Sequence, residues 1–311
     1  MAVAAKADNM KATAEMGVRA QTARSAGAQM LLGLIGSGIQ RSLTPAMQEA
    51  EAASQGLKVN YQLIDLDRTG EGVEALPSLL HTARTLGFAG LNITFPCKQA
   101  VIPLLDELSD EARAMGAVNT VVMRGDRLVG HNTDGSGWRW GFERALPNAE
   151  LKRVVLLGGG GAGSAIAHAL LRMACVQLIV VDHDAARARE LASKLAAQYP
   201  RALIEGSDDA ASALQGAGGV VHATPTGMDK LPGTPIDTAL LPAGAWLSEI
   251  VYFPLETQLL KAARAKGLRT VDGGTMAVGQ ALGAFELFTG RKANAARMDA
   301  HFRQLVSKRS S

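Results

Sequence analysis

Short apolar runs alternate with segments of helical period along most of the chain. Strands and helices that alternate in this way favour a parallel or mostly parallel sheet. In the first part, the predicted strands are LLGLIG, VNYQLID and FAGLNIT, and the predicted helices are residues 45–56, 71–86 and a stretch near 109–115. The runs AVNTVVM and RLVGHN then flank Arg124-Gly125-Asp126, which is typical of a hairpin turn.

A second alternating unit begins near Ser136. A helix to about Leu146 precedes the strand RVVLL, the glycine run GGGGAG and another helix. The later predicted elements are the strands QLIVVD, ALIEG, GGVVHAT, AWLSEIV and LRTVD, the helix 185–198 and two helices within residues 275–308. The predicted fold class is therefore α/β, with one mostly parallel unit, a second unit that carries a dinucleotide loop, and a helical end.

Length, composition and charge narrow the picture. The 311 residues exceed the ~100–200 residues of one domain, which favours two domains. A net charge of only +3, without a dense run of Lys or Arg, argues against nucleic acid or a membrane surface as partner. No apolar run approaches the roughly 20 residues that a transmembrane helix needs. We therefore expect an ordinary globular protein.

The N-terminal stretch and the cysteines bear on location. Residues 1–29 are rich in alanine and lack the apolar core of a signal peptide, so we expect a disordered leader. Asp8 and Glu15 count against an organelle-targeting sequence. Cys97 and Cys175 have no CxxC spacing, which suits a reducing cytosol better than a disulfide framework. These features predict a cytoplasmic protein.

The glycine run has the context of a cofactor site. It matches G-x-G-x-x-G through Gly158, Gly160 and Gly163, between a predicted strand and a predicted helix. Such glycines permit a tight turn and bring backbone N–H groups, here also those of Gly161 and Ala162, close to a pyrophosphate at the positive helix end. Glycines can also serve helix–sheet packing alone. The order of strand, loop, helix, strand and acid favours dinucleotide binding.

Asp182 indicates which dinucleotide is bound. It ends the next predicted strand, where this fold places its ribose-reading residue. A carboxylate there accepts hydrogen bonds from the ribose hydroxyls and repels a 2′-phosphate, and the turn VDHDAARA has no arginine before Arg187. The alternative, that Asp182 or Asp184 only caps the following helix, suits Asp184 better. We therefore expect NAD rather than NADP.

Polar side chains cluster at strand ends in the first unit. Asn92, Thr94 and then Lys98 come at the end of one strand, where open α/β sheets bind ligands. Asn119 lies at one end of a later strand, and Asp134 lies at the junction of the two units, where a bound dinucleotide would meet a substrate. The alternatives are an ordinary surface lysine for Lys98 and a helix cap for Asp134.

Two hydroxyls precede a proline in RSLTPAMQ. Thr44 is predicted to cap a helix in which Pro45 is the first residue, and Ser42 lies two positions earlier. The start of a helix offers its positive end to an anion, so capping and anion binding are compatible.

Motifs over nearly the whole chain follow the order seen in one family. They are SLTPAMQ, NITFPCKQ, AVNTVV, GHNTDGSG, GGGGAGSAI, ATPTGM, IVYFPLETQLL and GGTMAVGQALGAFELFTG, and they span about residues 31–308. In these motifs the chain resembles the shikimate/quinate dehydrogenase family. The resemblance implies a substrate-binding catalytic domain of residues 30–135, completed by residues 275–311, and a Rossmann dinucleotide-binding domain of residues 136–274.

The resemblance also implies roles for particular residues. Lys98 and Asp134 match the lysine and aspartate that flank the hydroxyl to be oxidised, and which of the two takes the proton stays open. The substrate-binding residues implied are Ser42 and Thr44 for the carboxylate, Thr94 and Asn119 for ring hydroxyls, and Tyr252 and Gln280 at the site's far side. Thr224 and Gly274 are expected in the cofactor site with the glycine loop and Asp182.

Several positions depart from the dedicated biosynthetic shikimate enzymes. Those enzymes usually carry Ser-x-Ser where this chain has Thr44, and Asn-Arg-Thr where it has Asp182 and the two residues that follow. Gln48 stands where they commonly have histidine. These departures make the chain most similar to the NAD-dependent quinate/shikimate enzymes of catabolism. Glu249 replaces an aspartate often found ahead of the tyrosine in the family, and Gly279 in MAVGQ is unexpected; each is expected to reshape the pocket only slightly.

The expected function is NAD-dependent oxidation of quinate to 3-dehydroquinate and of shikimate to 3-dehydroshikimate. The alternatives are an NADP-dependent biosynthetic shikimate dehydrogenase and a non-catalytic sensor that binds a ring acid or NAD. Retention of Lys98, Asp134 and the glycine loop favours an enzyme. No metal is expected, because the six histidines show no ligand spacing. The expected state is a monomer or a homodimer with a small-molecule substrate.

Overall fold

The first half of the chain builds one mixed sheet. The computed structural model describes residues 29–310. The strands of the first sheet are β1 (Gln29–Gly36), β2 (Lys58–Asp65), β3 (Phe88–Ile93), β4 (Glu107–Leu108), β5 (Thr120–Arg124) and β6 (Arg127–His131), in the order β2-β1-β3-β5-β6-β4. All pairs are parallel except β3–β5 and β5–β6, which are antiparallel, and β5 and β6 form the predicted hairpin.

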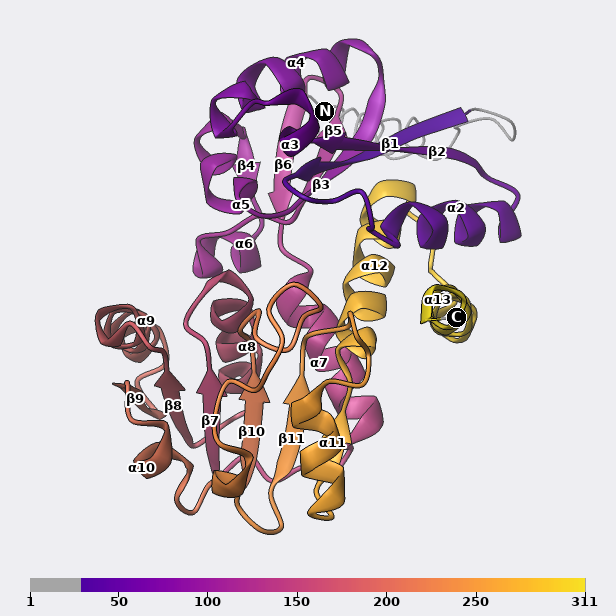
Figure 1. Cartoon of the computed structure of the whole chain (residues 1–311). Helices are drawn as coiled ribbons and strands as arrows, with labels where there is room; N and C mark the ends of the chain where they lie inside the picture. The colour runs from indigo at the N-terminus through magenta and orange to yellow at the C-terminus, as the bar shows by residue number, and fades with distance from the viewer. Residues whose placement is uncertain (1–28, 311) are drawn as a thin grey trace, which may run out of the picture.

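Helices connect and cover these strands (Figure 1). They are α2 (Thr44–Ser54), α3 (Leu66–Thr69), α4 (Leu76–Thr85), α5 (Cys97–Ala100) and α6 (Asp110–Met115), with 3₁₀ turns at Val73–Ala75 and Ile102–Leu104. The predicted cap of α2 is wrong: Leu43 precedes the helix, Thr44 is its first residue, and the Thr44 N–H instead donates to Ser42 Oγ at 3.3 Å. The short helices α3 and α5 were not predicted, since four residues carry no helical period.

The second sheet is parallel throughout. Its strands are β7 (Arg153–Leu157), β8 (Gln177–Val181), β9 (Leu203–Ser207), β10 (Gly219–His222), β11 (Trp246–Glu249) and β12 (Arg269–Val271), in the order β12-β11-β10-β7-β8-β9. Its helices are α7 (Asp134–Ala145), α8 (Gly161–Arg172), α9 (Ala185–Gln198), α10 (Ala210–Leu214) and α11 (Gln258–Ala265), with a 3₁₀ turn at Thr238–Leu240. The strand order reverses between β7 and β10, as in a Rossmann fold.

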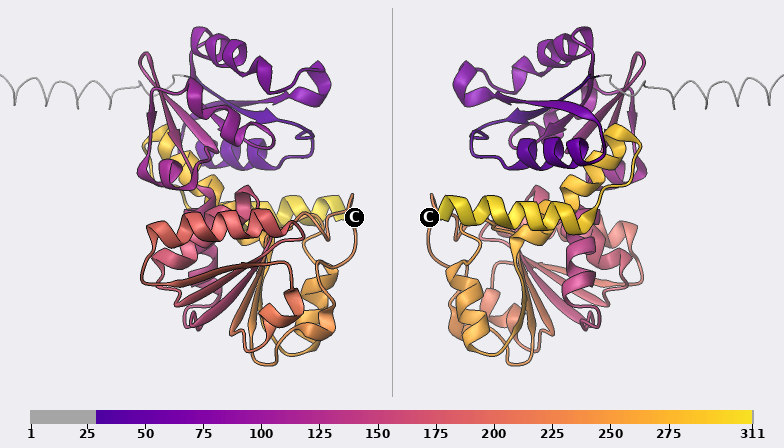
Figure 2. Two further views of the ribbon diagram at one scale, coloured as in Figure 1. Left: turned by 90° about the vertical axis from the view of Figure 1, so that its left-hand side faces the viewer. Right: turned by 90° about the vertical axis from the view of Figure 1, so that its right-hand side faces the viewer.

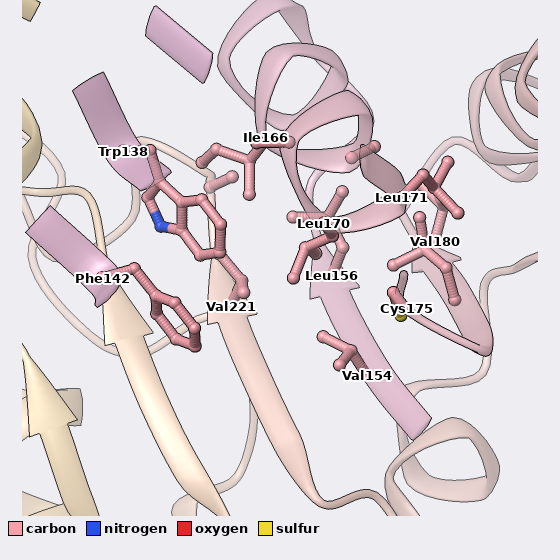
Figure 3. Close-up of a cluster of buried hydrophobic side chains, with 14 of the residues drawn as sticks. Trp138, Phe142, Val154, Leu156, Ile166, Leu170, Leu171, Cys175, Val180 and Val221 are labelled. Carbon is pink, nitrogen blue, oxygen red and sulfur yellow. The ribbon is translucent and has the colours of Figure 1, made fainter. Parts of the chain in front are cut away.

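Apolar side chains of α7 and α8 pack on one face of the second sheet (Figure 3). The rings of Trp138 and Phe142, one helical turn apart on α7, stack with centroids 4.7 Å apart. Trp246 of β11 meets Phe142 edge-on at the same centroid distance. Burying these large aromatic groups fixes α7, and with it Asp134 at the helix start, against the sheet.

Two helices at the end of the chain return to the first sheet. They are α12 (Gly273–Thr289) and α13 (Ala295–Ser310). Phe288 of α12 packs with Leu32 of β1 in the core of the first sheet, and α13 lies across the junction between the two sheets (Figure 2). The α/β class, the Rossmann second unit and the returning C-terminal helices are therefore confirmed.

Two predictions concern the N-terminal leader and membrane-spanning helices. The expected leader, residues 1–29, lies outside the described residues apart from Gln29, the first residue of β1. None of the described helices combines the length and the apolar composition needed to cross a membrane.

Candidate active site

A pocket of about 340 Å³ lies between the two sheets. On the side of the first sheet, the pocket is lined by the segments that follow β1 and β3 and by the start of α2. On the other side, it is lined by the loops that follow β10 and β11 and by α12. The lining includes these sequence-predicted residues: Ser42, Thr44, Thr94, Lys98, Asn119, Tyr252 and Gln280. Segments far apart in the sequence thus converge on one pocket.

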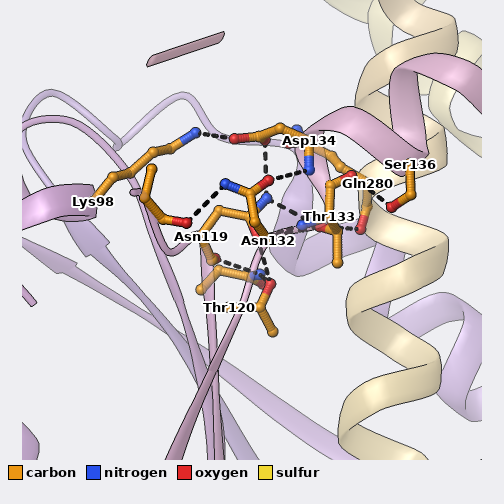
Figure 4. Close-up of polar contacts among 10 residues, drawn as sticks. Lys98, Asn119, Thr120, Asn132, Thr133, Asp134, Ser136 and Gln280 are labelled. Atoms are coloured by element: carbon orange, nitrogen blue, oxygen red, sulfur yellow. Dashed lines mark hydrogen bonds and ion pairs between the residues drawn. The ribbon is translucent and has the colours of Figure 1, made fainter. Parts of the chain in front are cut away.

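Lys98 and Asp134 form an ion pair at the pocket wall (Figure 4). Lys98 Nζ lies 2.6 Å from Asp134 Oδ2, and the Asp134 side chain is only 2% exposed against 25% for Lys98. Lys98 comes from the short helix α5 after β3, and Asp134 is the first residue of α7. A buried carboxylate is costly unless it is paired, and Lys98 supplies the opposite charge. Lys98, and not Asp134, lines the pocket.

Asn119 fixes the other oxygen of this carboxylate. Its Nδ2 donates to Asp134 Oδ1 at 2.9 Å, while its Oδ1 accepts from the Thr133 N–H at 2.9 Å. The backbone N–H of Asp134 donates to Asn132 Oδ1 at 2.9 Å. Because β5 runs antiparallel to β3, the residue just before β5 lies at the edge where β3 ends, which brings Asn119 near Lys98.

The side chain of Asn92, near the end of β3, is fixed by hydrogen bonds on both of its polar atoms. Asn92 lines the pocket, its Oδ1 accepts from Tyr61 Oη at 2.7 Å, and its Nδ2 donates to Thr120 Oγ1 at 3.1 Å. Burial raises the pKa of Tyr61 well above its ordinary value, so its hydroxyl stays a donor. Thr94 follows two residues later, in the same lining.

The returning helix and the loop after β11 close the pocket. Gln280 of α12 lines it, and its backbone carbonyl accepts from Thr133 Oγ1 at 3.1 Å. Tyr252 is half-buried, and desolvation raises its pKa above the ordinary value despite the opposing effect of Arg309. The phenol is therefore a neutral donor and acceptor at physiological pH.

The glycine loop connects β7 to α8. Gly158 has φ +109°, and a Cβ on Gly163 would lie 1.9 Å from the Gly158 carbonyl oxygen, so both positions require glycine. A Cβ on Gly160 or Gly161 would meet nothing within 4 Å, so the backbone there is open toward the carboxyl edge of the sheet. The loop thus fits a pyrophosphate, with the N–H groups of Gly161 and Ala162 at the helix start.

Asp182 lies directly after β8, beside this loop. Its Oδ2 accepts from the Gly159 N–H at 2.8 Å, and Arg187 Nη1 lies 3.4 Å from Oδ1. Burial alone would raise the pKa of Asp182, but the N–H groups of Asp184 and Gly159 and the nearby Arg187 hold it below the ordinary value. Asp184 caps α9 by accepting from Ala186 and Arg187 N–H groups. The carboxylate of Asp182 is therefore ionised beside the loop.

The remaining two predicted cofactor residues differ in setting. Thr224 follows β10, and its Cγ2 would lie 2.9 Å from a Cβ on Gly158. Gly274 lies near the start of α12, where its N–H donates to Asp272 and a Cβ would lie 2.5 Å from the Phe302 ring. Packing explains glycine there, and a cofactor contact of Gly274 stays a prediction.

Sequence reasoning missed several residues of the pocket. They include Arg41, Asp229, Lys230 and Phe253, of which the first three are exposed. Arg41 Nη1 and Asp229 Oδ2 lie 3.8 Å apart, both well exposed, and join the two sides of the pocket. Arg41, Asp229 and Lys230 adjoin the SLTP and ATPTGM motifs, and Phe253 lies within IVYFPLETQLL, which was the available signal. Among residues 29–310, no group of three or more His, Cys, Asp or Glu side chains could hold a metal ion.

A Rossmann-type sheet with a glycine loop beside a polar pocket is the architecture of dinucleotide-dependent oxidoreductases. Comparison with known proteins agrees. A family model described as the shikimate dehydrogenase substrate binding domain matches residues 34–121. A shikimate dehydrogenase (NADP(+)) of Streptomyces avermitilis is 53% identical over 278 residues, which cover 89% of this chain and 96% of that protein.

Two further relatives carry another name. A quinate/shikimate dehydrogenase (NAD(+)) of Corynebacterium efficiens is 48% identical over 279 residues, which cover 89% of this chain and 98% of that protein. The structure of quinate dehydrogenase from Corynebacterium glutamicum in complex with NAD matches with a TM-score of 0.84 and 46% identity, over 89% of this chain and all of that one. The chain belongs to the shikimate dehydrogenase family of oxidoreductases, which confirms the resemblance seen in its motifs.

Proposed function

We propose that the protein is an NAD-dependent dehydrogenase that oxidises quinate to 3-dehydroquinate and shikimate to 3-dehydroshikimate. The observation that carries the proposal is the Lys98–Asp134 pair, 2.6 Å apart, whose lysine lines the pocket between the two sheets. Family membership supports the dehydrogenase activity, and relatives named for NAD and for NADP both support a nicotinamide cofactor.

The lysine–aspartate pair handles the proton of the substrate hydroxyl. Lys98 Nζ faces the pocket, while Asp134 holds it from behind and is itself fixed by Asn119. As the carbinol carbon is oxidised, the hydroxyl proton moves toward this pair. Tyr252, Thr94 and Gln280 surround the same space and orient the ring hydroxyls.

The dinucleotide fits the glycine loop. Gly160 and Gly161 leave the backbone open, and Asp182 stands at the ribose position of the fold. When bound there, the nicotinamide accepts the hydride from the substrate. The ionised Asp182 favours the two ribose hydroxyls of NAD and repels a 2′-phosphate, since like charges in contact cost several kcal/mol.

The substrate carboxylate binds at the start of α2. Ser42 Oγ accepts from the Thr44 N–H, which leaves the Ser42 proton for an anion in the pocket. Thr44 adds its own hydroxyl and a methyl group, and Arg41 and Lys230 add positive charge at the mouth. The methyl group of Thr44 distinguishes the pocket from one with serine, at the position where quinate's C1 hydroxyl lies.

The two sheets support the proposed domains, residues 30–135 with 275–311 and residues 136–274. Both cysteines are free and buried, which supports a cytoplasmic location. A monomer or a homodimer is the proposed state.

One observation favours a second candidate. The 53% identical relative is named an NADP(+) shikimate dehydrogenase, and Arg187 stands beside Asp182 where it could meet a 2′-phosphate. On this alternative the chain is a biosynthetic shikimate dehydrogenase.

Product analysis tests the proposal. The full chain is incubated with NAD or NADP and with either quinate or shikimate, products are identified by NMR, and Lys98→Ala is the matched control. The expected products are 3-dehydroquinate and 3-dehydroshikimate, both formed at least roughly a hundredfold more slowly by the variant. Formation of 3-dehydroshikimate alone, and only with NADP, would support the second candidate. No product with any pair would contradict both.

A further inference from the structure

A histidine and a glutamate lie buried at the ends of two neighbouring strands. His222 is the last residue of β10 and Glu249 the last of β11, and the parallel register places them opposite each other. Both side chains are 0% exposed, with His222 Nδ1 2.8 Å from Glu249 Oε1. Polar groups buried so deeply are costly unless all their hydrogen bonds are made. Neither residue belongs to the Lys98–Asp134 pair.

Glu249 is surrounded by donors. Its Oε1 accepts from the N–H groups of Ile250 at 2.8 Å and Val251 at 2.9 Å, and its Oε2 accepts from Thr257 Oγ1 at 3.0 Å. A carboxylate with these partners acts toward His222 as an acceptor too, so the ring proton of His222 resides on Nδ1.

The opposite ring nitrogen reaches Thr224. His222 Nε2 lies 2.5 Å from Thr224 Oγ1, and the same oxygen accepts from the Thr226 N–H at 3.3 Å. In the neutral ring with its proton on Nδ1, Nε2 is an acceptor, so the hydroxyl proton of Thr224 points to the ring. Oγ1 then keeps one lone pair that faces away from His222.

Thr224 stands where the strand order of the second sheet reverses. β7 carries the glycine loop, β8 with Asp182 lies on one side of β7, and β10 lies on the other. A dinucleotide with its pyrophosphate on the loop and its adenosine ribose at Asp182 extends its nicotinamide half over the end of β10. Thr224 is half-buried there, in contact range of Gly158.

We propose that His222, backed by Glu249, is a positioning residue that makes the Thr224 hydroxyl an acceptor for a hydroxyl or amide donor on the nicotinamide half of the cofactor. The inference rests on the proposed dinucleotide site. It applies equally to NAD and NADP, because the two differ only at the adenosine ribose, far from β10.

A matched pair of substitutions separates the two contacts of His222. Asparagine places its amide nitrogen where Nδ1 stands and keeps the bond to Glu249, but it is too short to reach Thr224. Glutamine reaches Thr224 through its amide oxygen but leaves Glu249 without this donor. Thr224→Val removes the hydroxyl alone, and Thr224→Ser restores it.

Steady-state kinetics with whichever substrate and dinucleotide the wild type turns over test the proposal. His222→Asn and Thr224→Val are each expected to raise KM for the dinucleotide roughly three- to tenfold, the value of one hydrogen bond, with KM for the ring acid within twofold. Thr224→Ser keeps the wild-type KM. His222→Gln mainly lowers Tm. The double variant His222→Asn/Thr224→Val is no worse than Thr224→Val, because His222 acts through Thr224.

Additive effects in the double variant, or an unchanged dinucleotide KM in Thr224→Val, would overturn the proposal. The second of these is decisive even where His222→Asn does not fold. A wild type that binds no dinucleotide in a fluorescence titration with NADH or NADPH would instead refute the proposed function, and this inference with it.

Discussion

At the scale of residues, Asp134 serves two neighbours at once. Asp134 Oδ2 accepts a hydrogen bond from Lys98 Nζ at 2.6 Å, and Oδ1 accepts one from Asn119 Nδ2 at 2.9 Å. The carboxylate itself is almost fully buried. Removing the lysine leaves the buried carboxylate without its cationic partner. Replacing the aspartate by asparagine keeps the shape and loses the charge.

Both changes are therefore expected to lower kcat. Lys98→Ala and Asp134→Asn each reduce kcat by roughly 10²- to 10⁴-fold, the usual contribution of a positioned acid or base. KM for the dinucleotide stays within a few-fold, since neither residue touches the glycine loop. Stopped-flow and steady-state rates measure this. A kcat within tenfold of wild type in Lys98→Ala would remove the lysine from the proposed chemistry.

Thr44 is the residue on which the choice of ring acid is proposed to depend. Thr44→Ser removes one methyl group from the pocket and is expected to lower the ratio of kcat/KM for quinate over shikimate roughly three- to tenfold. Ser42→Ala is the matched control, because it weakens the carboxylate site for both acids alike. An unchanged ratio in Thr44→Ser would show that the methyl group does not discriminate.

Sequence was informative about these residues because chemistry-bearing side chains stand in recognisable motifs. It could not predict the partners that reach them from elsewhere: Tyr61 below Asn92, or Asp229 opposite Arg41. Such contacts join segments that share no local pattern. The cap of α2 was mispredicted because proline is tolerated throughout the first turn of a helix. Pro45 therefore did not reveal whether the helix begins at Thr44 or at Pro45.

At the scale of elements, the crossing of α7 and α12 explains an unexpected glycine. A Cβ on Gly279 would lie 2.2 Å from the Gly137 carbonyl oxygen, and one on Gly137 would lie 2.3 Å from the Gln280 nitrogen. The two helices touch backbone to backbone, which brings Gln280 beside Thr133 and so close to Asp134. Sequence could not reveal this, since the partner glycine lies on another helix.

Gly279→Ala is expected to separate the helices and displace Gln280. The clash involves backbone atoms that cannot turn aside, so both Tm and kcat/KM for the ring acid fall, the latter by at least about tenfold. Gly283→Ala, one turn further along α12, is the matched control because its Cβ would meet only the Thr133 side chain at 3.1 Å. Equal effects of the two variants, by calorimetry and rate, would contradict this reading of the crossing.

A second tie between elements joins α2 to α13. Glu51, 0% exposed at its side chain, accepts from Arg297 Nε and Nη2, each at 2.7 Å. Burial alone would raise the pKa of Glu51, but Arg297 and the Asn294 N–H lower it below its ordinary value of 4.5. The stabilisation is therefore complete above about pH 4.5 and is lost as pH falls through the lower pKa of the folded protein.

Arg297→Ala is expected to lower Tm by several degrees at pH 7, because it leaves the buried carboxylate unpaired. The difference from wild type shrinks as pH falls below 4.5, where Glu51 becomes protonated. Lys292→Ala, which breaks an exposed pair with Glu286, is the control and leaves Tm nearly unchanged. Thermal melts from pH 7 to pH 3 measure this. A difference that grows with acid would contradict the assigned pair.

At the scale of the whole molecule, the pocket exists because the chain crosses between its two sheets twice. It passes once into α7 and returns through α12, so the pocket is walled by both sheets and by the returning helix. The alternation of strands and helices predicted this α/β architecture, since periodicity reports burial directly. The mixed order of the first sheet and the position of α13 depend on long-range packing, which periodicity does not report.

The central claim is that the protein oxidises a ring acid bound in this pocket, with NAD as the hydride acceptor. Its most direct test is the initial rate at 340 nm for the wild-type chain, with quinate and shikimate each paired with NAD and NADP. We predict turnover of both acids with NAD, and kcat/KM for NAD at least about tenfold above that for NADP. Turnover of shikimate with NADP alone would contradict the proposed roles of Thr44 and Asp182 together.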